Sequence, residues 1–150
     1  MKKTLPFLLT LALLLTACKA SKTVAHTDLL LPQKEQTWQL VARQGHPLNR
    51  TKAAPTLVIN PDADVATGFA YCNEYTFKLE LVPAGSQPDG DYHTIHLGLW
   101  GSGNLSCPEA DMNAEQRYLS LLAKASRLRI TATTLTLFQR DKEILHFELK

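Results

Sequence analysis

Residues 106–125 read SCPEADMNAEQRYLSLLAKA, and they interrupt a chain that elsewhere alternates like β-strands. Their apolar residues recur near the 3.6-residue period of a helix. These residues are Met112, Tyr118, Leu119, Leu122 and Ala125. Ser106 and Glu109 have the spacing of a capping box, and Pro108 falls within the first turn. The segment therefore predicts one helix, from about Pro108 to Ala125.

Short runs rich in β-branched and aromatic residues flank this helix on both sides. Before the helix they cover residues 37–43, 56–60, 65–71, 75–82 and 92–99. After it, alternating residues around 127–131, 134–137 and 145–149 indicate three more strands. The runs are separated by turn residues such as Gly, Pro, Asn and Asp. We expect an α+β fold: a curled, barrel-like antiparallel β-sheet of about eight strands with one packed α-helix.

The N-terminus has the layout of a signal peptide. Lys2 and Lys3 precede an apolar segment, residues 5–17, and polar residues return too soon for a membrane-spanning helix. Leu15, Thr16, Ala17 and Cys18 resemble the lipobox of bacterial lipoproteins, in which the cysteine sulfur receives a diacylglyceryl group. Residues 1–17 are then a lipoprotein signal peptide and Cys18 is the lipidation site. The alternative is an ordinary secreted protein in which Cys18 is incidental.

Residues 18–36 have no sustained hydrophobic period and are expected to be a lipidated tether, with one domain at 37–150. Lys19 after the cysteine favours the outer membrane and a domain that faces the periplasm. Removal of residues 1–17 leaves 14 of the 16 basic side chains against 14 acidic ones. Because no basic stripe remains, we do not expect the protein to bind nucleic acid.

Several motifs of the expected domain, taken in order, resemble the META/HslJ family. They are Trp38 to Leu40, Cys72-Asn73-Glu74-Tyr75, Cys107 before a helix with Glu115-Gln116, Leu135 to Leu137, and Ile144 to Phe147. One departure is Tyr71, since the family usually has glycine before this cysteine. The resemblance implies a small, mostly β envelope protein, associated with stress or antibiotic tolerance, that is not an enzyme and carries no cofactor.

Cys72 and Cys107 are the cysteines that remain once Cys18 is acylated. An exported protein folds in an oxidising compartment, so we expect them to form a disulfide bond. The alternative is a reactive thiol near the start of the helix, where the helix dipole lowers a cysteine pKa.

Other patterns carry weaker signals. Residues 98–104, GLWGSGN, are expected to form a mobile loop in which Trp100 and Asn104 belong to a binding surface. The alternative is that Trp100 plugs one end of the core. His93 and His96 face opposite sides of a strand, so we expect no metal site there. We find no catalytic motif.

Two functions are compatible with these features. In the first, the lipid anchor holds the protein on the membrane and its domain docks on another envelope protein. In the second, the domain carries a lipid or small amphiphile in an internal apolar cavity.

Overall fold

The computed structural model describes residues 35–49, 53–82 and 92–150. Within them the elements are β1 (Thr37–Arg43), β2 (His46–Pro47), β3 (Thr56–Asn60), β4 (Val65–Ala70), β5 (Asn73–Leu81), β6 (His93–Ser102), α1 (Glu109–Leu122), β7 (Arg127–Ile130), β8 (Thr134–Gln139) and β9 (Lys142–Leu149). The predicted signal peptide, Cys18 and nearly all of the predicted tether lie outside the described residues.

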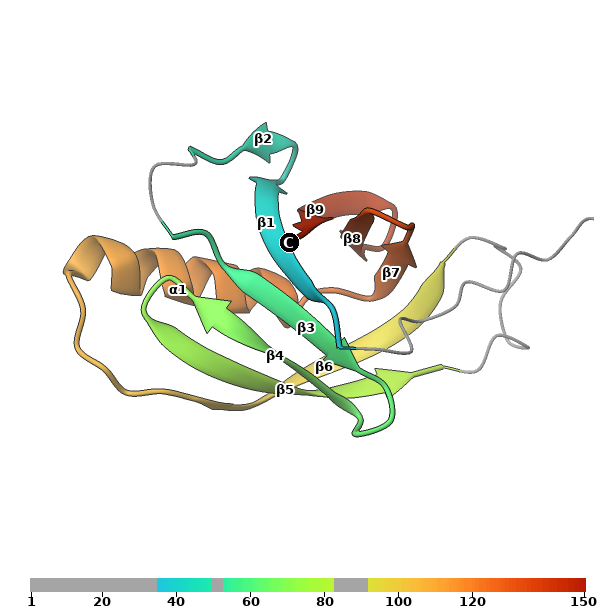
Figure 1. Ribbon diagram of the computed structural model, residues 1–150, viewed down its shortest axis with the longest axis horizontal. Coiled ribbons are helices and arrows are strands. Elements are labelled where there is room, and N and C mark those ends of the chain that lie inside the picture. Colours follow the sequence, from blue (N-terminus) through green and yellow to red (C-terminus); the bar gives the residue numbers. More distant parts are fainter. Residues whose placement is uncertain (1–34, 50–52, 83–91) are drawn as a thin grey trace, which may run out of the picture.

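The nine strands form one antiparallel sheet in the order β2-β1-β3-β4-β5-β6-β7-β8-β9. Because β1 also pairs with β9, the sheet curls into a ring (Figure 1). The two-residue β2 only extends the edge of β1, where we had expected a turn. The expected α+β fold with a curled antiparallel sheet and one packed helix is confirmed.

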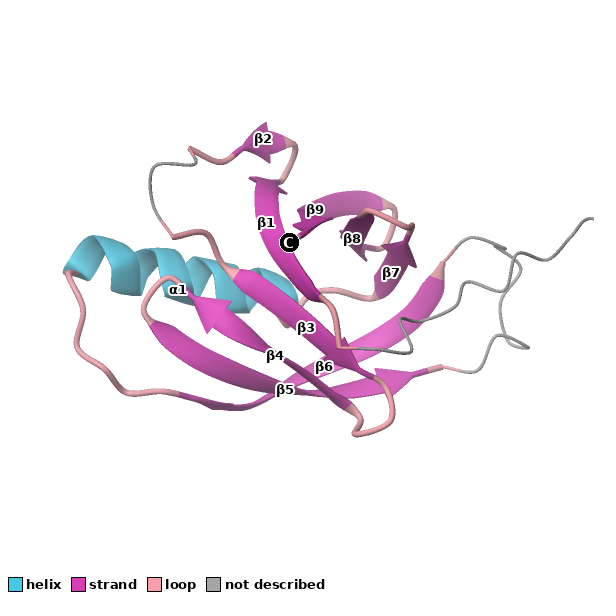
Figure 2. Cartoon of the chain, viewed as in Figure 1, coloured by secondary structure: helices cyan, strands magenta, loops and turns pink. Residues whose placement is uncertain are grey.

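The core fills the inside of this ring. Side chains of β5 alternate between buried and more accessible positions, as the period of a strand requires, and so do those of the first half of β1. The largest fully buried side chains are Trp38, Phe77, Tyr118 and Phe147. Helix α1 packs against β4 and β9 and contributes Tyr118 and Leu122 to the core. Figure 2 shows the helix lying along one side of the sheet.

The helix begins later than the capping box predicted. Its N-cap is Pro108, whose carbonyl accepts the N–H groups of Asp111 at 2.9 Å and Met112 at 3.2 Å, and no side chain caps it. The predicted capping role of Ser106 was wrong because a proline disfavours the helical region for the residue before it, so the helix starts after Pro108. Among the described residues, no helix is long and apolar enough to cross a membrane.

Strand β6 reaches Ser102, beyond the predicted end of that strand at residue 99. Thr76 of β5 pairs with Gly101 and Tyr75 pairs with Ser102. Most of the glycine-rich run is therefore part of the sheet, and the expectation of a mobile loop there was wrong. The reason is that backbone pairing with β5 outweighs the low strand propensity of glycine.

Candidate functional site

Asn73 joins three segments of the chain at the β4–β5 corner. Its backbone N–H donates to Glu115 Oε2 at 2.7 Å, and its side-chain Nδ2 donates to Glu115 Oε1 at 3.0 Å. Its Oδ1 accepts the N–H of Leu105 at 2.8 Å. Asn73 is buried, so these bonds replace water on polar groups that would otherwise be costly to bury. The corner, the helix and the segment after β6 are thereby held together.

The disulfide between Cys72 and Cys107, as expected, links the β4–β5 corner to the segment between β6 and α1. It connects residues that are 35 apart in the sequence. The alternative of a reactive thiol at the helix start does not apply, because both sulfur atoms are in the bond. This site is therefore structural.

Tyr71 occupies a left-handed backbone conformation, with φ of 64°. The N–H of Cys72 donates to the carbonyl of Ala70 at 2.7 Å, so Tyr71 is the central residue of a γ-turn with positive φ, which is rare and strained. The ring of Tyr71 meets that of Tyr118 edge-on, with centroids 6.5 Å apart. The corner thus has the geometry that suits glycine, but a tyrosine stands there and packs on the helix.

Two buried tyrosine hydroxyls share one carbonyl beneath this corner. The Tyr75 hydroxyl donates to Thr56 O at 2.7 Å and lies 2.9 Å from the Tyr118 hydroxyl. Burial raises the pKa of both hydroxyls above the usual range, with the largest effect coming from lost hydration. Gly68 leaves room for this arrangement, because a Cβ there would collide with Thr56 O and the Tyr75 hydroxyl. Both tyrosines stay neutral and fasten the helix to the sheet.

Trp100 is 73% exposed, so it does not plug the core. Phe77 of β5 pairs with Leu99 and Thr76 pairs with Gly101, which makes Trp100 the extra residue of a β-bulge. A bulge re-aims a side chain, and here it turns the indole into solvent. The neighbouring Leu99 is 53% exposed. The two side chains form an exposed apolar pair on a strand that is otherwise firmly paired to β5.

This apolar pair borders an open strand edge. On the side away from β5, only His93 and Thr94 of β6 pair with a described strand, β7. The N–H of Ile95 donates to Ser126 O at 3.1 Å on that side. Because alternate residues of a strand direct their backbone groups to opposite edges, the N–H and C=O groups of Leu97 and Leu99 also face it.

A pocket of about 500 Å³ lies beside these two residues, on the side toward β5, where Lys78 of β5 pairs with Gly98 of β6. Leu99 and Trp100 line it together with Asp64 and Lys78. Asn104, the other residue expected on a binding surface, is exposed in the segment after β6 but does not line this pocket. The structure thus exposes both residues and does not bring them into one pocket.

His93 and His96 both lie on β6. His93 is half-buried and His96 is exposed. Among the described residues, no group of three or more His, Cys, Asp or Glu side chains could hold a metal ion.

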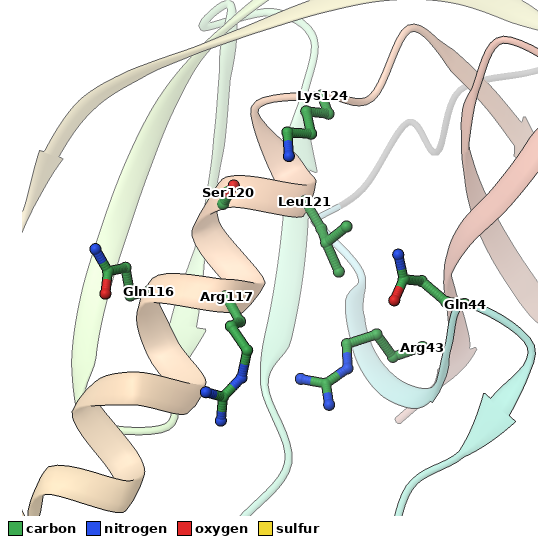
Figure 3. A pocket seen from close by; sticks show the side chains of 7 residues that line it. All are labelled: Arg43, Gln44, Gln116, Arg117, Ser120, Leu121 and Lys124. Carbon is green, nitrogen blue, oxygen red and sulfur yellow. The ribbon is translucent and has the colours of Figure 1, made fainter.

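A second groove, of about 450 Å³, lies between α1 and the end of β1 (Figure 3). Arg43, Arg117 and Lys124 contribute its cationic side chains. The sequence shows no basic stripe, and it did not predict this site. The seven-residue spacing of Arg117 and Lys124 indicates a shared helix face, but Arg43 comes from a distant part of the sequence and joins them only in the fold.

A family model described as META domain matches residues 30–150. The chain belongs to the META domain family. No curated protein sequence matches it significantly. Among solved structures, an NMR structure of a protein from Burkholderia xenovorans aligns with a TM-score of 0.55 at 21% identity, covering 77% of this chain and 81% of that one. Another NMR structure aligns with a TM-score of 0.49 at 20% identity, covering 76% of this chain and 88% of that one. This chain and the protein from Burkholderia xenovorans therefore share a fold.

Proposed function

We propose that the protein is a lipoprotein of the bacterial cell envelope whose META domain binds another envelope protein and does not catalyse a reaction. The support for anchoring comes from the sequence. A basic start, an apolar segment and a lipobox precede Cys18. Diacylglycerol with an added acyl chain would hold the protein on a membrane stably. We place the anchor in the outer membrane, with the domain facing the periplasm.

Labelling with radioactive palmitate tests the anchor. The full chain expressed in bacteria should take up label, and Cys18→Ala should take up none. Cys72→Ala, which leaves the lipobox intact, is the matched control and should keep the label. If Cys18→Ala is labelled as strongly as the unchanged protein, the lipoprotein proposal is wrong.

The open edge of β6 with its exposed Trp100 is the observation that carries the docking role. An unpaired edge offers N–H and C=O groups to another strand, and native proteins usually protect such edges. Peptides recognise edges of this kind by adding a strand, with side-chain pockets supplying specificity. Tryptophan is frequent among residues that dominate binding energy. The partner is therefore an envelope protein that adds an extended segment beside Leu97 and Leu99.

The surroundings of Trp100 define what that segment carries. Leu99 and Trp100 offer an apolar surface, so an apolar side chain of the segment would lie there. Asp64 and Lys78 supply charges of both signs next to it. The alternative, a lipid carried inside the ring, gains no support from the described residues, because Trp38, Phe77 and Phe147 fill the interior.

A photo-reactive amino acid at position 101 tests docking in living cells. A side chain at Gly101 has open space, so the probe does not disturb the fold. In the full chain it should form one defined adduct, and the cross-linked peptide should be an extended segment of another envelope protein. A probe at Met112, which is also an exposed apolar position, should not form this adduct.

Two substitutions separate docking from chance contact. Leu99→Pro removes the N–H that faces the open edge and should abolish the adduct. Trp100→Ala should weaken binding by about thirtyfold, since a central tryptophan contributes on the order of 2 kcal/mol. Adducts of equal yield from positions 101 and 112, or an adduct that survives Leu99→Pro in a folded protein, would refute the docking role.

A further inference from the structure

The groove between α1 and the end of β1 is built from two rigid walls. On the sheet side, Arg43 pairs with Leu145 of β9, and the N–H of Gln44 donates to Ile144 O at 2.9 Å. On the helix side, Arg117 projects from α1, and Lys124 follows in the turn directly after its end. The groove is therefore held in shape before any ligand arrives.

The charged side chains that line this groove are all positive. Arg43, Arg117 and Lys124 line it, and none of its lining residues in the described part of the chain is acidic. None of the three forms an ion pair with any residue that the structure describes. Like charges placed together repel one another, and that repulsion is relieved when an anion enters. The three cationic side chains are therefore more stable with an anion bound between them than in the free protein.

Arg43 and Arg117 line this groove from its two walls. Figure 3 shows the Arg43 side chain reaching from the end of β1 toward α1, the helix that carries Arg117. Guanidinium groups bind phosphate and carboxylate oxygens with two parallel hydrogen bonds, which gives both strength and orientation. Ser120 and Gln116 add hydroxyl and amide donors along the helix wall.

We propose that this groove binds a compact polyanion that carries phosphate or carboxylate groups, bridged by Arg43 and Arg117. Lys124 neutralises further charge at the helix end of the groove. The phosphate can come from a free polyanion or from a lipid headgroup. The site is separate from the β6 edge and depends neither on docking there nor on the lipid anchor.

Isothermal titration of the full chain in a neutral detergent tests this site. Sodium pyrophosphate serves as the free polyanion, and dihexanoyl phosphatidylglycerol, kept below its micelle concentration, serves as the soluble headgroup. At least one should bind with one-to-one stoichiometry, and its binding should weaken as salt is added. Arg43→Gln and Arg117→Gln should each weaken binding by about tenfold or more, because each removes charge-assisted hydrogen bonds.

A matched control removes a positive charge elsewhere. Lys150→Gln lies at the opposite end of β1, where the N–H of Lys150 donates to Thr37 O. It should leave binding within about twofold of the unchanged protein, whereas Lys124→Gln should weaken binding more. Urea unfolding of each variant shows that it is folded.

The outcomes divide clearly. Pyrophosphate binding that both arginine substitutions weaken, without binding of the lipid, supports the site and assigns a free polyanion as its ligand. Lipid binding with the same dependence on both arginines supports the site and assigns a headgroup. Absence of binding to both probes, or an equal loss in Lys150→Gln and Arg117→Gln, would overturn the proposal.

Discussion

Tyr71 permits a direct test of backbone strain at the β4–β5 corner. Its φ of 64° costs an L-residue about 1–2 kcal/mol relative to ordinary backbone. We compare Tyr71→Ala with Tyr71→Gly, because both lose the ring contact with Tyr118 and differ only in the backbone. Alanine keeps the strain and glycine relieves it, while the greater freedom of glycine in the unfolded chain costs about 0.4–1 kcal/mol. Tyr71→Gly should therefore be the more stable by about 0.5–1 kcal/mol.

Glu74 supplies the matched control three residues away. It is exposed in β5 and has no positive φ. Glycine in the middle of an ordinary strand is destabilising relative to alanine by about 0.5–1 kcal/mol. Glu74→Gly should therefore be less stable than Glu74→Ala, so the difference has opposite signs at the two positions.

Urea unfolding followed by tryptophan fluorescence, with the disulfide intact, measures all four variants. The dependence of the unfolding free energy on urea should be the same for each, so that the midpoints report stability. If Tyr71→Ala is at least as stable as Tyr71→Gly, the left-handed conformation is not the source of strain at this corner.

Three further predictions concern the same region. Glu115→Ala leaves the N–H and Nδ2 of Asn73 unpaired, so it should lower the free energy of unfolding by about 2–3 kcal/mol. Glu115→Gln should lower it by less. A loss below about 0.5 kcal/mol for Glu115→Ala in urea unfolding would show that these hydrogen bonds do not stabilise the β4–β5 corner. Reduction of the disulfide, which closes a 35-residue span, should lower the free energy of unfolding by about 3.5–4 kcal/mol. A melting temperature that reductant leaves unchanged would contradict this prediction. Burial raises the pKa of Tyr75 and Tyr118, so the folded protein keeps protons that the unfolded chain loses. The contribution of these tyrosines to stability should be constant below about pH 10, and stability should fall above it by about 1.4 kcal/mol per pH unit for each tyrosine. Tyr118→Phe should show a shallower fall, and equal slopes in the two proteins would refute this explanation.

The amino-acid sequence by itself determined the class of the fold and many of its elements. Runs 37–43 and 56–60 coincide with β1 and β3, and the helix lies within the predicted segment. The disulfide followed from the expected export of the protein, and it too is present. These features could be predicted because hydrophobic period and residue type report directly on which face of an element is buried.

Only the tertiary structure decided the features of the candidate sites. Glycine-rich composition around Trp100 indicated a loop, but pairing with β5 made it a bulged strand with an open edge. The family resemblance marked the corner at Tyr71 but did not show that a tyrosine adopts positive φ there. Arg43 and Arg117 line one groove although they lie far apart in the chain. The physical reason is that periodicity is a local signal, whereas strand register, bulges and converging side chains depend on how distant segments pack around one core.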